Sequence, residues 1–222
     1  MFDITHTPVA TTIARMAELI DAVAAANHQS LGSITDDITP FHSRAVPGIS
    51  IRDYLERVAK FVFLENDTLL AVLVYLDRIA GAQRHRPALA LSPFNIHRLA
   101  ITAIVVAHKF TSDIFFNNAR YSKVGGIPLA EMNQLELEML FLVKFDLMVD
   151  AAELQRVGEW LLAHPVAPLR HQPPYGLLAQ YYERQMPALQ PHQLIPTPQL
   201  DPMTGCAHGA VPPLELAPCL PY

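Results

Sequence analysis

The sequence predicts an all-α protein, and three observations carry that prediction. Apolar residues recur at the three-and-four spacing of a helix face along most of the first 162 residues. Two runs, 69–76 and 99–107, are apolar around the whole circumference of a helix, which indicates burial on every side. No strand pattern longer than four residues occurs. We therefore expect a bundle whose two middle helices are enclosed by amphipathic ones.

An amphipathic helix is expected first, over residues 12–26. Its apolar stripe consists of Ile13, Met16, Ile20 and Val23. Residues 27–48 are polar and interrupted by glycine and proline, which predicts a connecting segment or an ordered arm.

Two helices should follow that arm. Ser50 is a suitable N-cap for a helix that runs to about residue 63, and Asn66 for a second one that runs to about residue 83. The inner face of the first should contain Ile51, Tyr54, Leu55, Val58, Phe61 and Val62.

Three further helices are expected after residue 90, with a turn between them. Ser92 and Pro93 can serve as the cap and first residue of a helix over 93–110. The Gly125-Gly126 pair predicts a turn, and Pro128 the start of a helix that runs to about residue 145. Asp150 with Glu153 resembles a capping box, which favours a last helix over 151–162.

The last 60 residues differ from the rest. They hold 13 of the 19 prolines, and proline fixes φ and removes a backbone donor. We therefore expect an irregular C-terminal extension and divide the chain into 1–40, 41–162 and 163–222. The two cysteines, Cys206 and Cys219, lie in this extension and are interpreted as free thiols.

Composition and charge narrow the class of protein. The chain has 222 residues, of which 51% are hydrophobic and 17% charged, so it can bury a sizeable core. Its net charge of -5 gives no electrostatic reason to expect nucleic acid or an anionic membrane as a partner. The start lacks the pattern of a signal peptide, and no apolar run approaches the roughly 18 residues of a membrane span. We expect a protein of the cytoplasm, the nucleus or both.

No catalytic or metal-binding constellation stands out. The ten histidines are scattered, and none pairs with another at the i, i+4 spacing that places two ligands on one helix face. A nucleophile elbow, a phosphate-cradling loop and a dinucleotide fingerprint are also absent. We therefore expect no catalytic residue, no metal and no cofactor.

Two charged residues stand within apolar helical sequence. Lys109 directly follows a buried run, and Glu136 lies between Leu135 and Leu137. Two interpretations are open from the residues alone. Lys109 can be a solvated helix end that suits the C-terminal dipole, with Glu136 on an ordinary exposed face. Alternatively, the two charges frame an exposed apolar patch that binds a partner.

Five stretches occur in a characteristic order. They are Phe41-His42-Ser43 through Ile51, Tyr75-Leu76-Asp77-Arg78, Asn95-Ile96-His97-Arg98-Leu99, Ala107-His108-Lys109-Phe110 with Asp113, and Asn117 to Gly126 with Glu131-Met132-Asn133 and Leu135-Glu136. Together they resemble the cyclin box, and within that family the P-type and U-type cyclins of the phosphate-pathway kinase. The asparagine pair followed by Lys-Val-Gly-Gly separates this subgroup from mitotic cyclins.

The resemblance implies a single five-helix cyclin box that binds and activates a cyclin-dependent kinase beside its C-helix, in cell-cycle or phosphate signalling. It implies no catalytic activity of the chain itself. Lys109 and Glu136 match the pair that cyclins use to hold the kinase segment before the C-helix. The matching apolar contacts are Val106, Phe110, Leu140, Phe145 and Leu147. Protein substrates or a kinase inhibitor are further partners that the resemblance leaves open.

Two positions have more than one interpretation. Asp113 matches an acidic residue that stands in for an activation-loop phosphate in this group, but it can equally be a solvated charge. The substrate-docking motif of cell-cycle cyclins keeps only Arg52 and Leu55 here, which puts a docking groove for substrates in doubt.

Two other classes of function are the alternatives. A cyclin-fold transcription factor or scaffold should carry a basic stripe, whereas residues 1–162 hold 14 basic against 18 acidic side chains. An all-helical hydrolase would need a metal or a polar pocket.

Overall fold

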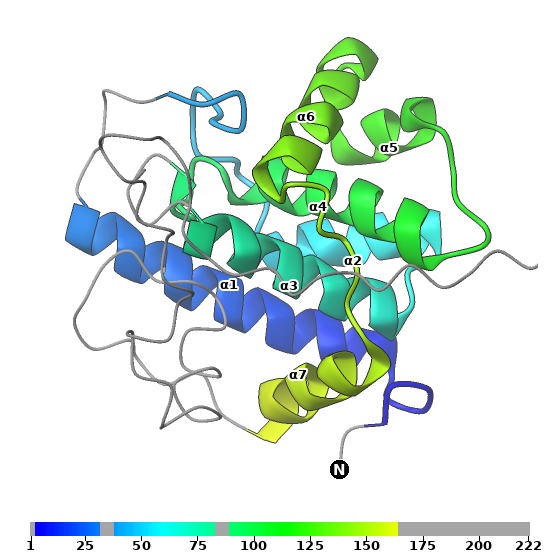
Figure 1. Ribbon diagram of the computed structural model, residues 1–222. Coiled ribbons are helices and arrows are strands. Elements are labelled where there is room, and N and C mark those ends of the chain that lie inside the picture. The colour runs from blue at the N-terminus through cyan, green and yellow to red at the C-terminus, as the bar shows by residue number, and fades with distance from the viewer. Residues whose placement is uncertain (1–2, 32–37, 83–88, 164–222) are drawn as a thin grey trace, which may run out of the picture. The chain divides into compact units, whose positions relative to one another are not determined.

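The structure is a computed structural model that describes residues 3–31, 38–82 and 89–163 (Figure 1). This part of the chain contains helices and no strand, so the all-α prediction is confirmed. The helices are α1 (Val9–Leu31), α2 (Ile51–Val62), α3 (Asn66–Ala82), α4 (Ile96–Thr111), α5 (Asn118–Gly125), α6 (Leu129–Leu142) and α7 (Ala151–Ala163).

Helices α3 and α4 form the centre, as the two fully apolar runs predicted (Figure 1). No residue from Leu69 to Leu76 is more than 1% exposed, and the run from Leu99 to Ala107 is buried throughout. Helix α3 also contacts α1 and α7, while α4 contacts α2, α5 and α6. The outer helices therefore cover the central pair, and α4 connects the core to the helices of the candidate site.

Local capping fixes the starts of α2 and α7 where the sequence placed them. The Ser50 hydroxyl accepts from the backbone N–H of Asp53 at 3.0 Å. One carboxylate oxygen of Asp150 accepts from the N–H of Glu153 at 2.7 Å. Each bond satisfies an amide that the first helical turn leaves free, so both cap predictions are confirmed.

Other helix ends differ from the expected ones. Helix α1 continues to Leu31 rather than ending near residue 26. Helix α4 begins at Ile96 rather than at Pro93, because the Asn95 side chain accepts from the N–H of Ser92 at 2.8 Å and donates to the Ala90 carbonyl at 2.9 Å. These bonds hold a turn in front of the helix.

The ends of α2 and α6 also depart from the predictions. Helix α6 stops at Leu142 instead of residue 145, since Lys144 and Phe145 adopt φ of 55° and 57°. Phe61 was expected on the inner face of α2, but its side chain is exposed. It lies in the last turn of that helix, where its carbonyl accepts from Arg120.

Helix α5 was not predicted, because its eight residues carry little apolar pattern. Asn117 caps it by accepting from the N–H of Arg120 at 3.1 Å, and Gly126 ends it with φ of 70°. Gly125 lies so close to α4 that a Cβ there would stand 2.9 Å from Ile101 Cγ1. The glycine pair therefore provides a close approach and a left-handed helix end, and α5 packs against α4.

The segment from residue 38 to α2 packs against the rest of the described chain. Phe41 is fully buried, and the backbone N–H of Ser43 donates to the Phe94 carbonyl at 2.8 Å. Arg98 donates to the Pro40 carbonyl at 2.8 Å and pairs with Glu131 of α6. Arg98 thereby ties this arm to α4 and α6.

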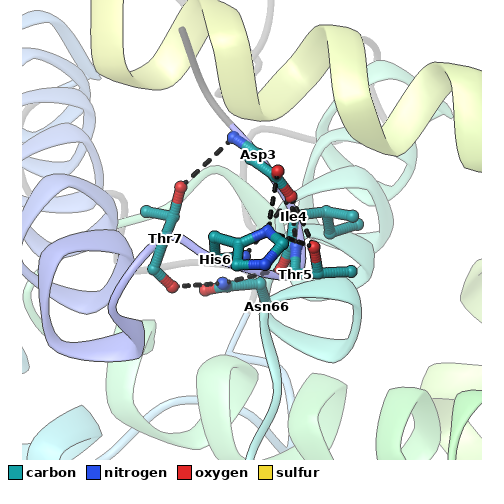
Figure 2. A network of polar contacts seen from close by, with 6 residues as sticks. All are labelled: Asp3, Ile4, Thr5, His6, Thr7 and Asn66. Atoms are coloured by element: carbon teal, nitrogen blue, oxygen red, sulfur yellow. Dashed lines mark hydrogen bonds and ion pairs between the residues drawn. The ribbon is translucent and has the colours of Figure 1, made fainter.

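A short loop precedes α1 and is closed by its own polar groups (Figure 2). One carboxylate oxygen of Asp3 accepts from the Thr5 hydroxyl at 2.6 Å, and the other lies 2.8 Å from His6 Nδ1. The backbone N–H of Asp3 donates to the Thr7 hydroxyl at 3.3 Å. The hydrogen bonds from Thr5 and His6 hold the pKa of Asp3 below its usual value.

Asn66 anchors this loop instead of capping α3 through its side chain. Its Nδ2 donates to the carbonyls of Ile4 at 2.9 Å and Thr7 at 2.7 Å (Figure 2). Its Oδ1 accepts from the buried hydroxyl of Thr12 at 2.7 Å. The first bond of α3 is instead accepted by the backbone carbonyl of Glu65. The predicted cap role of Asn66 is therefore wrong, because its side chain joins the loop, α1 and α3.

Replacing Asn66 with alanine is expected to lower the free energy of unfolding by about 1–3 kcal/mol, since the buried Thr12 hydroxyl loses its acceptor. Urea denaturation followed by circular dichroism measures this change. The exposed Asn133→Ala variant serves as the control and should change stability by less than about 0.5 kcal/mol. An Asn66→Ala midpoint equal to that of the unmodified chain would contradict the anchoring role.

The predicted C-terminal extension lies outside the described residues, except for position 163 at the end of α7. The same holds for Cys206 and Cys219. The division at residues 40 and 162 stays a prediction. Among the described helices, none combines the length and apolarity that crossing a membrane requires.

Candidate functional site

Lys109 and Glu136 meet in the structure. Lys109 lies in the last turn of α4, and its Nζ is 2.5 Å from Oε1 of Glu136 in α6. Their side chains are only 28% and 18% exposed, which is unlike a pair of freely solvated charges. The C-terminal dipole of α4 also favours the lysine cation. The residues alone left two interpretations open. This geometry fits better the one in which the two charges frame an exposed apolar patch that binds a partner.

Asn118 completes this group from a third helix. Its Nδ2 donates to Oε2 of Glu136 at 2.6 Å and to Oδ1 of Asn133 at 2.8 Å. Each oxygen of the Glu136 carboxylate therefore has a different donor. We call Lys109, Asn118 and Glu136 the polar triad. Sequence reasoning assigned no role to Asn118, although the asparagine pair was part of the resemblance.

Two buried rings, those of His108 and Tyr121, lie next to the polar triad. The Tyr121 hydroxyl lies 2.9 Å from Nδ1 of His108, the residue before Lys109. Burial lowers the pKa of His108 and raises the pKa of Tyr121. A neutral His108 can accept from the Tyr121 hydroxyl, which itself accepts from the N–H of Phe116 at 3.4 Å. These bonds hold the end of α4 against α5.

Large apolar side chains are exposed on α4, on α6 and directly after α6. Among the predicted contacts, Phe110 and Phe145 are exposed, while Leu140 and Leu147 are partly buried against the core. Val106 is only 3% exposed, so it lies beneath the surface rather than on it.

Sequence reasoning missed Leu137 and Phe141, which are also exposed. They stand four residues apart on α6, so they form a stripe beside Glu136. The rings of Phe141 and Phe145 meet edge to face, with centroids 5.5 Å apart. We define the α4–α6 surface as the polar triad together with Phe110, Leu137, Leu140, Phe141 and Phe145.

The two residues of the predicted substrate-docking groove lie in different environments. Arg52 is exposed, and its Nε is 3.0 Å from Oε1 of Glu56 one turn along α2. Leu55 is 0% exposed and belongs to the hydrophobic core. Leu55 lies on the face of α2 that packs against the core, so in this structure it cannot contact a docked peptide.

Asp113 is exposed in the segment between α4 and α5. It lies four residues after Lys109 and five before Asn118. This position suits both interpretations of Asp113, the phosphate substitute and the solvated charge.

The described residues contain no group of three or more His, Cys, Asp or Glu side chains that could hold a metal ion. The geometry of the α4–α6 surface offers hydrogen-bonding groups beside apolar area. That is the composition of a site that binds a protein segment.

Three known proteins illustrate what this chain is similar to. The PHO85 cyclin-like protein psl1 of Schizosaccharomyces pombe is 44% identical over 123 residues, which are 55% of this chain and 50% of that protein. Cyclin-P4-1 of Oryza sativa subsp. japonica is 42% identical over 144 residues, or 65% of this chain and 66% of that protein. Cyclin-U4-1 of Arabidopsis thaliana is 40% identical over 139 residues, or 62% and 67%.

The similarity thus covers between half and two thirds of the length of these relatives. Their names confirm the predicted resemblance to the P-type and U-type subgroup. The family model described as Cyclin matches residues 7–147, which include α1 to α6 and the whole α4–α6 surface. Because this match spans more than half of the sequence, the chain belongs to the cyclin family.

Proposed function

We propose that this chain binds a cyclin-dependent Ser/Thr protein kinase through the α4–α6 surface and activates it, while contributing no catalytic group itself. The observation that carries the proposal is the Lys109–Glu136 pair, partly buried beside exposed phenylalanines. Relatives named as PHO85-type, P-type and U-type cyclins favour kinase regulation over a cyclin-fold transcription factor or scaffold.

The chemistry of the surface suits a kinase segment. Lys109 has three N–H donors and uses one on Glu136, so the others can donate to backbone carbonyls of a partner loop. The apolar side chains supply the burial. A patch of ~800 Å² per partner is typical of stable complexes, and buried apolar area contributes about 25 cal/mol per Å² before association costs.

Activation follows from preferential binding. A protein kinase transfers phosphate only when its C-helix glutamate pairs with the lysine that holds the ATP phosphates. A cyclin that binds the conformation containing this pair more tightly shifts the kinase population toward it. The resemblance to P-type and U-type cyclins implies phosphate signalling or the cell cycle as the process, and the proposal includes this regulation for the chain.

The test uses the full-length chain with cyclin-dependent kinases from the same cell. Binding is measured by surface plasmon resonance, and activity by phosphorylation of a peptide. We expect at least one kinase to bind and to gain activity. The chain with ATP alone, and the complex with a kinase lacking its ATP-binding lysine, should transfer no phosphate.

Two results would overturn the proposal. One is failure of every kinase to bind or respond. The other is tight, salt-sensitive binding to DNA in a gel-shift experiment without kinase activation, which would favour the transcription-factor alternative.

A further inference from the structure

We propose that Asn118 is a positioning residue that fixes the Glu136 carboxylate for the kinase and so preforms the charged part of the α4–α6 surface. The inference rests on the proposed function of that surface. It assigns Asn118 a role that acts through Glu136, without requiring contact with the kinase.

The hydrogen bonds decide which way the Asn118 amide faces. A carboxylate only accepts, so the amide must turn its NH₂ group toward Glu136 Oε2, 2.6 Å away. In this orientation the buried Oδ1 of Asn118 has no partner among the described residues. Turning the amide over would place Oδ1 against the carboxylate. The bond to Glu136 therefore determines the orientation even though it leaves an acceptor unpaired.

The carboxylate is held at both oxygens, and the two donors come from different helices. Lys109 of α4 binds Oε1 at 2.5 Å, and Asn118 of α5 binds Oε2. The ammonium group of Lys109 lies at the end of a long, flexible side chain. Asn118 has a short side chain and is the first residue of α5. Without Asn118, only the flexible Lys109 side chain would hold the Glu136 carboxylate. The carboxylate would then lose its conformational freedom only when the kinase binds.

The expected size of the effect follows from that ordering. Immobilising a flexible side chain on binding weakens affinity by about 3- to 10-fold. We therefore expect Asn118→Ala to weaken kinase binding by this factor at every pH, with little change in the activity of the saturated complex.

Asn118→Asp separates positioning from general structure. An aspartate at the first position of α5 suits the helix dipole, so α5 should remain folded. The substitution nevertheless replaces the donor with a second carboxylate facing Glu136. Two adjacent carboxylates share a proton when the pH falls, and because the Lys109 ammonium beside Glu136 favours their charged forms, this sharing needs an acidic pH. Binding of Asn118→Asp, relative to the unmodified chain at the same pH, should be weaker than that of Asn118→Ala at pH 7.5 and recover toward pH 5.5.

The control is Asn133→Ala, which removes the other acceptor of the Asn118 amide and leaves its bond to Glu136 in place. It should bind the kinase within about 2-fold of the unmodified chain. Circular dichroism and thermal denaturation confirm the fold of each variant before binding is measured.

The outcomes distinguish this inference from the proposed function. If the unmodified chain binds no kinase, the proposed function fails and this inference fails with it. If it binds, and substitutions at Lys109 and Glu136 weaken binding while both Asn118 variants bind normally, only the positioning role is overturned. The positioning role is also overturned if the loss of kinase affinity in Asn118→Asp is independent of pH.

Discussion

Charge reversal at the Lys109–Glu136 pair is expected to weaken kinase binding at least about 30-fold. Glu136→Lys would place two ammonium groups where Nζ and Oε1 now lie 2.5 Å apart, and it would deprive Asn118 of its carboxylate acceptor. Removing one partner of a hydrogen-bonded charge pair that is buried in an interface costs about 2–5 kcal/mol. That range corresponds to roughly 30-fold or more in the dissociation constant. Surface plasmon resonance with the purified kinase measures it.

Matched variants isolate the pair from general charge effects. Lys109→Glu should lose binding to a similar degree, and combining it with Glu136→Lys should recover part of the loss by restoring opposite charges. Lys60→Glu changes the net charge by the same amount as Lys109→Glu, on the exposed side of α2, and should bind normally. The assignment of this surface fails if both single reversals bind like the unmodified chain, or if Lys60→Glu loses as much.

Local signals explain which parts of the fold could be predicted. The runs from Leu69 to Leu76 and from Leu99 to Ala107 are apolar in every direction, and only full enclosure accommodates such helices. The caps at Ser50 and Asp150 act within three residues, so the sequence alone contains both partners of each bond.

Contacts from distant parts of the chain decide the rest. Asn66 looks like a cap in sequence, yet residues more than 50 positions away take up its side chain. Helix α5 has a weak apolar pattern and depends on the close approach of Gly125 to Ile101. Phe61 follows the inward spacing of α2, but at the end of that helix its side chain is exposed. No local pattern contains this information.

The candidate site divides in the same way. The resemblance supplied Lys109 and Glu136, and the structure shows that α4 and α6 bring them together. Asn118 reaches Glu136 because α5 packs beside α6, and this contact is not visible in the sequence. Leu137 and Phe141 look like core residues in an apolar stretch, and only the direction in which α6 faces the core shows that they are exposed. A surface built from three helices is a tertiary feature.

Leu55→Ala is expected to lower the free energy of unfolding by about 2–5 kcal/mol, the usual cost of removing a buried leucine side chain. Leu55 is 0% exposed and lies in the same core cluster as Ile51 and Val58 of α2. Alanine at this position removes apolar contacts and leaves a cavity that neighbouring helices can fill only in part. Guanidinium denaturation followed by circular dichroism measures the shift.

Arg52→Ala provides the comparison, because Arg52 is the other residue that survives from the docking motif. Its pair with Glu56 is exposed on one helix, and such pairs contribute only about 0.3–0.5 kcal/mol. A docking role for Leu55 requires an exposed side chain, so it predicts an unchanged unfolding midpoint together with poorer phosphorylation of particular substrates. A core role predicts the reverse, a large loss of stability with normal kinase activation under conditions where the variant remains folded. If Leu55→Ala unfolds at the same guanidinium concentration as Arg52→Ala, the assignment of Leu55 to the core is wrong. That result would favour the substrate-docking role of Leu55.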